Sequence, residues 1–125
     1  ELPNLLRVFV GESGQTSPKN TVVVLETNLD DVSGEIIGYT LERLFAAGAL
    51  DVFTIPIQMK KNRPGVFLSV ICPPPLVPQC GEILFRETKT FGIRKATYER
   101  TILERESFDV QTKFGPVKAK RGWRG

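Results

Sequence analysis

Apolar residues change their spacing several times along this chain, and each change predicts a new element of structure. Residues 5–11 (LLRVFVG) form a short apolar run typical of a strand, and residues 21–29 (TVVVLETNL) are β-branched and apolar enough for a buried strand. In residues 33–51 apolar positions recur every three or four residues, which is the period of one helix face. Ser33 suits the N-cap of this helix, and Gly48 suits a left-handed closing turn.

The second part of the chain alternates strands with one more helix. Residues 51–59 (DVFTIPIQM) and 66–72 (VFLSVIC) are apolar strand runs, and residues 76–88 return to helical spacing. Residues 91–112 alternate with a break in the middle, which predicts two strands. Residues 115–122 (GPVKAKRG) predict a further short strand.

Proline and glycine pairs mark two predicted turns. Arg63-Pro64-Gly65-Val66 fits a type II turn, in which proline takes the first central position and glycine supplies the positive φ of the second. The pair Gly115-Pro116 predicts the turn before the last strand.

Apolar positions of these elements also predict the core. Both cysteines, Cys72 and Cys80, are too few for a disulfide framework and are expected to be packed inside. The aromatic residues expected in the core are Phe9, Phe45, Phe53, Phe67 and Phe85.

The predicted order over residues 21–100 is β-α-β-β-α-β. Because right-handed crossovers join parallel strands, the simplest fold is an α+β, ferredoxin-like sandwich of two helices on one antiparallel sheet, with extra C-terminal β-strands. We divide the chain into an N-terminal strand and polar loop (1–20), this core (21–100) and a C-terminal β extension (101–125). The chain opens on Glu1 and is expected to be a fragment of a longer protein.

Composition narrows the classes of function. The 125 residues are 41% hydrophobic and 25% charged, which indicates an ordinary globular domain, and we expect a cytoplasmic protein without a membrane segment. The chain has no histidine, which excludes histidine-activated nucleophiles and imidazole metal sites within it. Residues 1–85 carry 6 Lys and Arg against 9 Asp and Glu, whereas residues 86–125 carry 11 against 5, so the last third is basic.

The predicted topology brings three polar loops to one end of the sheet, namely residues 27–33 (TNLDDVS), 59–65 (MKKNRPG) and 86–92 (RETKTFG). Carboxylate oxygens suit Mg²⁺ or Mn²⁺, whereas lysine and arginine suit phosphate oxygens. The carboxylates near these loops are Asp30, Asp31 and Glu35. The cationic and hydroxyl side chains near them are Lys60, Lys61, Arg63, Arg86, Thr88, Lys89, Thr90 and Arg94. Together they predict a metal–triphosphate site.

Each part of this pattern also has a purely structural interpretation. Asp30 and Asp31 can be acids at a helix start, and the hairpin cations can protect an edge strand from pairing. Arg86 can complement the end of its helix, and threonines form turns. The convergence of three loops favours the functional interpretation.

Two long motifs, residues 26–65 and 84–94, together with the GPVKAK tail, resemble the carboxyl-terminal domain of the LarC nickel insertion protein family, which makes the nickel-pincer cofactor of lactate racemase. The resemblance covers nearly the whole chain. Val32 and Ser33 depart from the methionine and threonine expected there.

This resemblance implies a CTP-dependent cyclometallase, a nickel chelatase that places nickel into pyridinium-3,5-bisthiocarboxylic acid mononucleotide. It implies that residues 21–100 bind CTP with Mg²⁺ or Mn²⁺, while nickel is the substrate metal, with ligands outside this fragment. Lys60, Lys61, Arg63 and Arg94 then hold the triphosphate. Thr88 and Thr90 hydrogen-bond phosphate or cytidine, Asp30 and Asp31 hold the divalent ion, and Glu35 supports them. The catalytic residues stay unassigned, and the fragment alone is not expected to insert nickel.

Two other functions stay open from the residues themselves. Ferredoxin-like domains often assemble, so the chain could be an oligomerising or regulatory nucleotide-binding module, and we expect a homo-oligomer. Binding of RNA through the basic last third is the other alternative. No stacked-aromatic signature of RNA recognition appears on the central strands, so we expect no nucleic-acid partner.

Overall fold

The computed structural model describes residues 5–10 and 19–124, and side chains from Asn20 onward. Most of the predicted polar loop before residue 21, and the side chain of Phe9, therefore lie outside the described residues. The elements in chain order are β1 (Leu5–Val10), β2 (Lys19–Leu29), α1 (Gly34–Ala46), β3 (Asp51–Met59), the 3₁₀ turn η1 (Lys60–Asn62), β4 (Arg63–Cys72), the 3₁₀ turn η2 (Pro74–Leu76), α2 (Val77–Thr88), β5 (Arg94–Thr101), β6 (Glu104–Thr112) and β7 (Gly115–Trp123).

The chain forms two compact units. We call Thr21–Glu99 the central unit, and Glu1–Asn20 with Arg100–Gly125 the terminal unit. Within the described ranges, no helix has the length and apolar character needed to cross a membrane.

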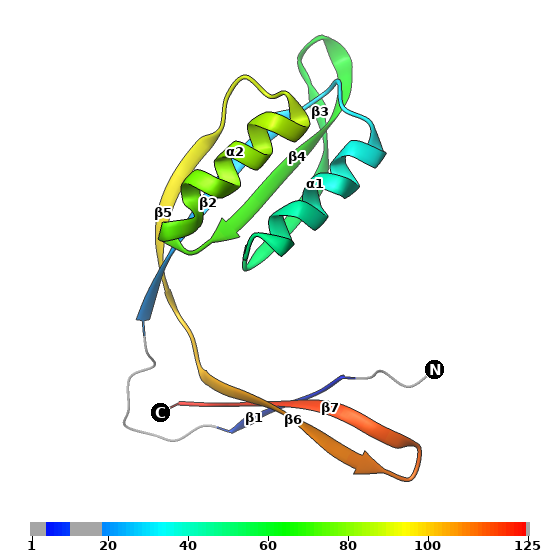
Figure 1. Ribbon diagram of the computed structural model, residues 1–125, viewed down its shortest axis with the longest axis vertical. Coiled ribbons are helices and arrows are strands. Elements are labelled where there is room, and N and C mark those ends of the chain that lie inside the picture. Colours follow the sequence, from blue (N-terminus) through cyan, green and yellow to red (C-terminus); the bar gives the residue numbers. More distant parts are fainter. Residues whose placement is uncertain (1–4, 11–18, 125) are drawn as a thin grey trace. The chain divides into compact units, whose positions relative to one another are not determined.

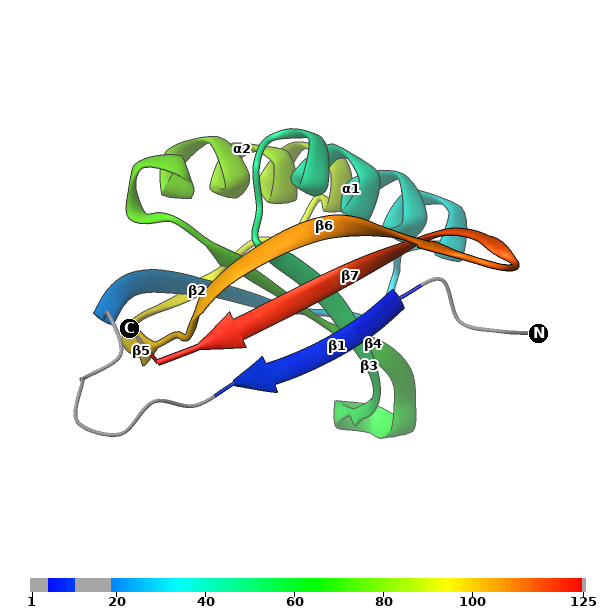
Figure 2. The same cartoon turned by 90° about the horizontal axis from the view of Figure 1, so that it is seen from below.

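The central unit is a four-stranded sheet with the strand order β3-β4-β2-β5. Both β2 and β3 run antiparallel to β4, so β2 and β3 are parallel to each other. The two helices lie side by side on one face of this sheet (Figures 1 and 2). This arrangement confirms the predicted ferredoxin-like order β-α-β-β-α-β.

The core lies between the sheet and the helices. Alternate residues of the strands face it, and Leu25 of β2 and Val52 of β3 both lie opposite Val70 of β4. The helices contribute Leu44 and Leu84, each fully buried in the same cluster. Burying such side chains is the main favourable term in folding a domain of this size.

Both thiols belong to this core, as predicted. Cys72 ends β4, Cys80 lies in α2, and both are fully buried. Burial raises the pKa of the Cys72 thiol and raises that of Cys80 to about 11, because an apolar interior disfavours the thiolate. Both groups are therefore structural thiols at neutral pH.

The ends of α1 follow the sequence prediction. The Ser33 hydroxyl accepts a hydrogen bond of 3.3 Å from the Ile36 N–H, which makes it the N-cap. The chain leaves the helix through Gly48 at a φ of 104°, a conformation that glycine adopts at low cost.

The predicted turn at Arg63-Pro64-Gly65-Val66 is wrong. The chain reverses earlier, through Lys60–Asn62, and Arg63 already pairs with Met59 at the start of β4. Lys61 and Asn62 supply the positive φ values that were expected from glycine.

Gly65 is needed for close packing instead. A Cβ at this position would lie 2.5 Å from Met59 Sδ and 2.7 Å from the Leu29 carbonyl oxygen. Its sequence signal was that of a turn, but its physical role is to let β4 approach the end of β2.

The prediction of an aromatic core is wrong for three residues. Phe45, Phe53 and Phe85 are 39–48% exposed. On β3, the buried neighbour Val52 faces the helices, so the alternation of the strand puts Phe53 on the opposite face. Phe67 is half-buried and lies under the Arg94 guanidinium, 5.9 Å from its carbon.

The terminal unit is a three-stranded sheet with the order β1-β7-β6, visible as three neighbouring ribbons in Figure 2. β6 and β7 form an antiparallel hairpin, and β1 pairs with β7 in parallel, with Leu5 opposite Lys118. The hairpin turns at Lys113 and Phe114, so the turn predicted at Gly115-Pro116 is two residues too late.

The chain enters and leaves the central unit at one point. Asn20 precedes it and Arg100 follows it, and the Arg100 Nε donates a hydrogen bond of 2.6 Å to Asn20 Oδ1. The two connecting segments therefore lie together.

Candidate functional site

Three loop regions lie at one end of the four-stranded sheet, and we call them the rim: residues 30–33, 60–63 and 89–94. β2 and β3 end there because they are parallel, and β4 and β5 begin there (Figure 1). The contacts described next join the hairpin and the third loop to β2, which lies between them in the sheet. The end of β2 is the centre of those contacts.

Two arginines connect the end of β2 to its neighbours. Arg63, which follows the hairpin turn, lies 3.6 Å from the Asp30 carboxylate. Arg94, the first residue of β5, donates a 2.7 Å hydrogen bond to Asn28 Oδ1, and its Nε lies 3.7 Å from Glu26 Oε2. Both ion pairs are partly exposed, so each stabilises the fold only modestly.

A partly buried hydroxyl network holds the third loop against β2. Thr27 Oγ1 lies 2.8 Å from Thr90 Oγ1, and both hydroxyls lie within hydrogen-bond distance of the Gly92 carbonyl, at 3.0 and 3.1 Å. Since each hydroxyl has one proton, one threonine donates to the carbonyl and the other donates to its partner hydroxyl. The Thr90 hydroxyl therefore takes part in hydrogen bonds that stabilise the loop.

Thr88 is also part of the fold. Its hydroxyl is buried and donates a 2.6 Å hydrogen bond to the Leu84 carbonyl. It also accepts from the Thr90 N–H at 3.3 Å. The hydroxyl that was predicted to contact a ligand thus closes α2 and orders the loop after it.

The hairpin lysines have different surroundings. Lys60 and Lys61 are exposed at the tip of the hairpin. None of the ion pairs found among the described residues includes either of them. The arginines of the rim are therefore paired with carboxylates, whereas these lysines are not.

The predicted metal ligands form no preassembled centre. Asp31 and Glu35 are exposed, and Asp30 is paired with Arg63. In the part of the chain that the structure describes, no three His, Cys, Asp or Glu side chains come together as metal ligands do. The residues present fit a Mg²⁺ or Mn²⁺ ion that arrives with phosphate groups, because such ions need only one or two protein carboxylates.

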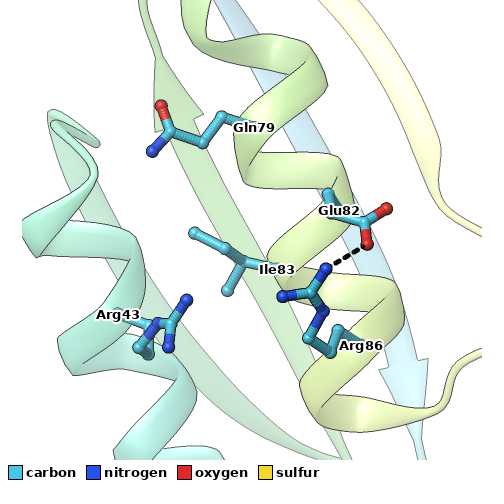
Figure 3. Close-up of a pocket in the computed structure, with 5 residues that line it drawn as sticks. All are labelled: Arg43, Gln79, Glu82, Ile83 and Arg86. Atoms are coloured by element: carbon cyan, nitrogen blue, oxygen red, sulfur yellow. Dashed lines mark hydrogen bonds and ion pairs between the residues drawn. The ribbon is translucent and has the colours of Figure 1, made fainter.

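Arg86 lies in a groove between the two helices. This groove has a volume of about 170 Å³, and α2 contributes Gln79, Glu82, Ile83 and Arg86 while α1 contributes Arg43 (Figure 3). Arg86 pairs with Glu82 at 2.9 Å, one helical turn away. Among described residues, no ion pair or hydrogen bond connects Arg86 to the rim.

Two residues in the β2 contacts were not assigned as site residues from the sequence. Glu26 and Asn28 alternate along β2, so both point away from the buried face that holds Thr27. Polar residues at every second position near the end of an apolar strand were the signal that could have identified them.

The fold and the rim define a ferredoxin-like domain with a cationic polar edge. Comparisons with known proteins identify the family to which this domain belongs. The nickel insertion protein family matches residues 1–125. A relative from Gloeothece citriformis, named as a candidate nickel insertion protein, is 57% identical over 95% of this chain. A second, from Nostoc sp., is 48% identical over 99% of the chain. The chain belongs to the nickel insertion protein family.

This chain spans 29% and 32% of the lengths of those two relatives. A solved structure described as LarC2, the C-terminal domain of a cyclometallase involved in synthesis of the NPN cofactor of lactate racemase, in its apo form, is 41% identical. It has a TM-score of 0.78, covering 82% of this chain and 72% of that one. A protein from Methanopyrus kandleri, 21% identical with a TM-score of 0.64 over 82% of this chain and 65% of its own, shares the fold.

Proposed function

We propose that this chain is the metal–CTP-binding domain of a CTP-dependent cyclometallase, which places nickel into pyridinium-3,5-bisthiocarboxylic acid mononucleotide. The similarity to LarC2 supports the reaction class. The observation that carries the nucleotide proposal is the rim, where lysines without carboxylate partners stand beside two carboxylates at the end of β2.

In this proposal the rim holds the triphosphate. Lys60 and Lys61 supply charges to its oxygens, and Arg63 and Arg94 add guanidinium groups that partner carboxylates already orient. A lysine and arginine clamp of this kind also stabilises the charge that develops when a phosphoanhydride bond breaks.

The divalent ion comes with CTP and joins the exposed Asp31. Asp30 can join it if the nucleotide displaces the carboxylate from Arg63, which lies 3.6 Å away and is 61% exposed. Bound there, Mg²⁺ or Mn²⁺ neutralises phosphate charge and fixes the triphosphate geometry. Glu35, in the first turn of α1, supports the metal through water.

Nickel is the substrate, and we assign it no ligand in this chain. The sequence contains no histidine, and both thiols are fully buried. Nickel prefers imidazole and sulfur ligands over hard oxygens. The sulfurs of the thiocarboxylates and the remainder of a longer protein are the proposed sources.

The test is calorimetric titration of the full chain with Mn²⁺–CTP. Lys60→Ala and Arg63→Ala should each weaken binding about tenfold, since each removes a charged contact. Lys113→Ala, in the β6–β7 turn, is the control for loss of net charge and should bind like the original chain. Helix content by circular dichroism checks folding. Unchanged affinity in both rim variants would show that the hairpin does not hold phosphate.

An oligomerising module is the second candidate function. It is favoured by exposed apolar side chains on the sheet face away from the helices, where Phe53 is 39% and Ile55 is 47% exposed. Light scattering measures the mass of the particle. A monomer that binds Mn²⁺–CTP would support the nucleotide-binding proposal and exclude the oligomerising module. An oligomer that does not bind CTP would favour the oligomerising module.

A further inference from the structure

The backbone of the rim contains an unusual conformation. Among the described residues, the non-glycine positions with positive φ are Lys61 at 58°, Asn62 at 56° and Lys89 at 59°. All three lie in the rim. Asparagine tolerates this left-handed region, but for lysine the Cβ crowds the backbone and raises the free energy of the folded state.

Lys89 is the clearer case because it closes a helix. It follows Thr88, the last residue of α2, at a position that glycine usually occupies. The other helix of the central unit shows the usual solution, with Gly48 just beyond its end. Glycine at position 89 would remove the strain, so the lysine side chain needs another reason to be there.

Lys89 has no charged partner among the side chains that the structure describes. Lys89 is exposed, and the ion pairs among the described residues do not include it. It shares this condition with Lys60 and Lys61, whereas Arg63 and Arg94 are paired. These three ammonium groups lie at the same end of the sheet, on either side of the end of β2, and their positive charges repel one another until an anion binds.

We propose that Lys89 is a phosphate-binding residue of the rim, and that the left-handed backbone at Lys61 and Lys89 is strain retained to place ammonium groups there. This inference rests on the proposed function and deepens it, because it adds a cation from the third loop to those of the hairpin. Strained backbone tends to occur at ligand-binding sites, where ligand contacts offset its cost.

The test uses two substitutions that separate charge from strain. Lys89→Gly removes both, and Lys89→Arg keeps both. Each variant of this chain is titrated with Mn²⁺–CTP and with MnCl₂ alone, and its melting temperature is measured by circular dichroism. Lys113→Gly, in the β6–β7 turn, controls for the loss of one surface charge.

Lys89→Gly should weaken Mn²⁺–CTP binding about tenfold. Its melting temperature should stay level or rise by up to about 5 °C, because glycine relieves the strain. Lys89→Arg should bind within about threefold of the original chain, and Lys113→Gly should bind like it.

Two results would overturn the inference while the proposed function stands. One is an original chain that binds Mn²⁺–CTP with a Lys89→Gly variant of equal affinity. The other is a Lys89→Gly variant whose melting temperature falls, since lysine would then support the fold itself. If the original chain does not bind Mn²⁺–CTP, the proposed function fails and this inference fails with it.

Discussion

The central and terminal units use different sources of stability. The central unit buries a cluster of aliphatic side chains and two thiols between its helices and sheet. In the terminal unit, Ala119 is the buried apolar residue among the described side chains, and its strands are joined by backbone pairing and surface contacts. One such contact is the ion pair of Arg121 with Glu106. The central unit should therefore carry most of the stability of the chain.

The two units can be followed separately. Both helices belong to the central unit, so far-ultraviolet circular dichroism reports mainly on it. The single tryptophan, Trp123, lies in β7, so its fluorescence reports on the terminal unit. Chemical denaturation with both signals tests each prediction below.

The largest effect is expected from Leu68→Ala. Leu68 is fully buried in β4, and removing its side chain should lower the unfolding free energy of the central unit by about 3 kcal/mol. Phe108→Ala, at a 41% exposed position of β6, should cost less than about 1 kcal/mol. Equal free-energy losses, for Leu68→Ala in the dichroism transition and for Phe108→Ala in the Trp123 fluorescence transition, would mean that the two units do not differ as described.

Gly65→Ala should cost about 2 kcal/mol in the same transition, because its Cβ would overlap Met59 Sδ and the Leu29 carbonyl. The matched control is Gly38→Ala in α1, where a Cβ meets nothing within 4 Å. That change should stabilise the helix by about 0.5–1 kcal/mol. A neutral Gly65→Ala would show that β4 does not need this close approach.

Thr27→Val tests the hydroxyl network that ties the third rim loop to β2. It keeps the shape of the side chain but removes a buried hydroxyl bonded to Thr90 and Gly92, and should cost about 1 kcal/mol. Thr21→Val, at an exposed position of the same strand, should be neutral. Binding of Mn²⁺–CTP should weaken in Thr27→Val alone, and equal behaviour of the two variants would contradict the role of the network.

The smallest effect, absent at neutral pH, concerns the thiols. Unfolded Cys80 loses its proton near pH 9, whereas the folded group keeps it until about pH 11. The unfolding free energy of the central unit should therefore be unaffected by this group below pH 9 and fall as pH rises from 9 to 11. Cys80→Ala should show a shallower fall, with the remainder due partly to Cys72, whose pKa burial also raises. Parallel pH profiles would show that Cys80 does not contribute.

Much of the central unit was predictable from the sequence because its signals are local. The change of spacing after residue 33, the N-cap Ser33 and the glycine at position 48 each specify a boundary by short-range physics. Right-handed crossovers then determine which loops share an end of the sheet.

The errors came from interactions between distant segments. Gly65 looked like a turn residue because its contact with Leu29 is made across the sheet. Phe53 looked like a core residue because sequence alone does not show which face of β3 the helices cover. The parallel pairing of β1 with β7 joins segments at opposite ends of the chain, and no local pattern indicates it.

The rim was predicted in outline and corrected in detail. The polarity of the loops and the predicted topology were sufficient to predict that Asp30 and Arg63 lie at the same end of the sheet, where they form an ion pair. They could not show that Thr88 is buried or that Arg86 pairs with Glu82 in the helix groove, because both depend on how α2 is rotated about its axis.

The central unit is inserted in the sequence of the terminal unit, and the hydrogen bond between Arg100 and Asn20 joins the two residues that flank the insertion. Once the central unit has folded, Asn20 and Arg100 are neighbours. The chain between β1 and β7 is then effectively shortened to residues 10–20 and residues 100–115, which lowers the entropy cost of pairing these two strands. Folding of the central unit thus brings the two segments of the terminal unit together. The terminal sheet should therefore form after the central unit.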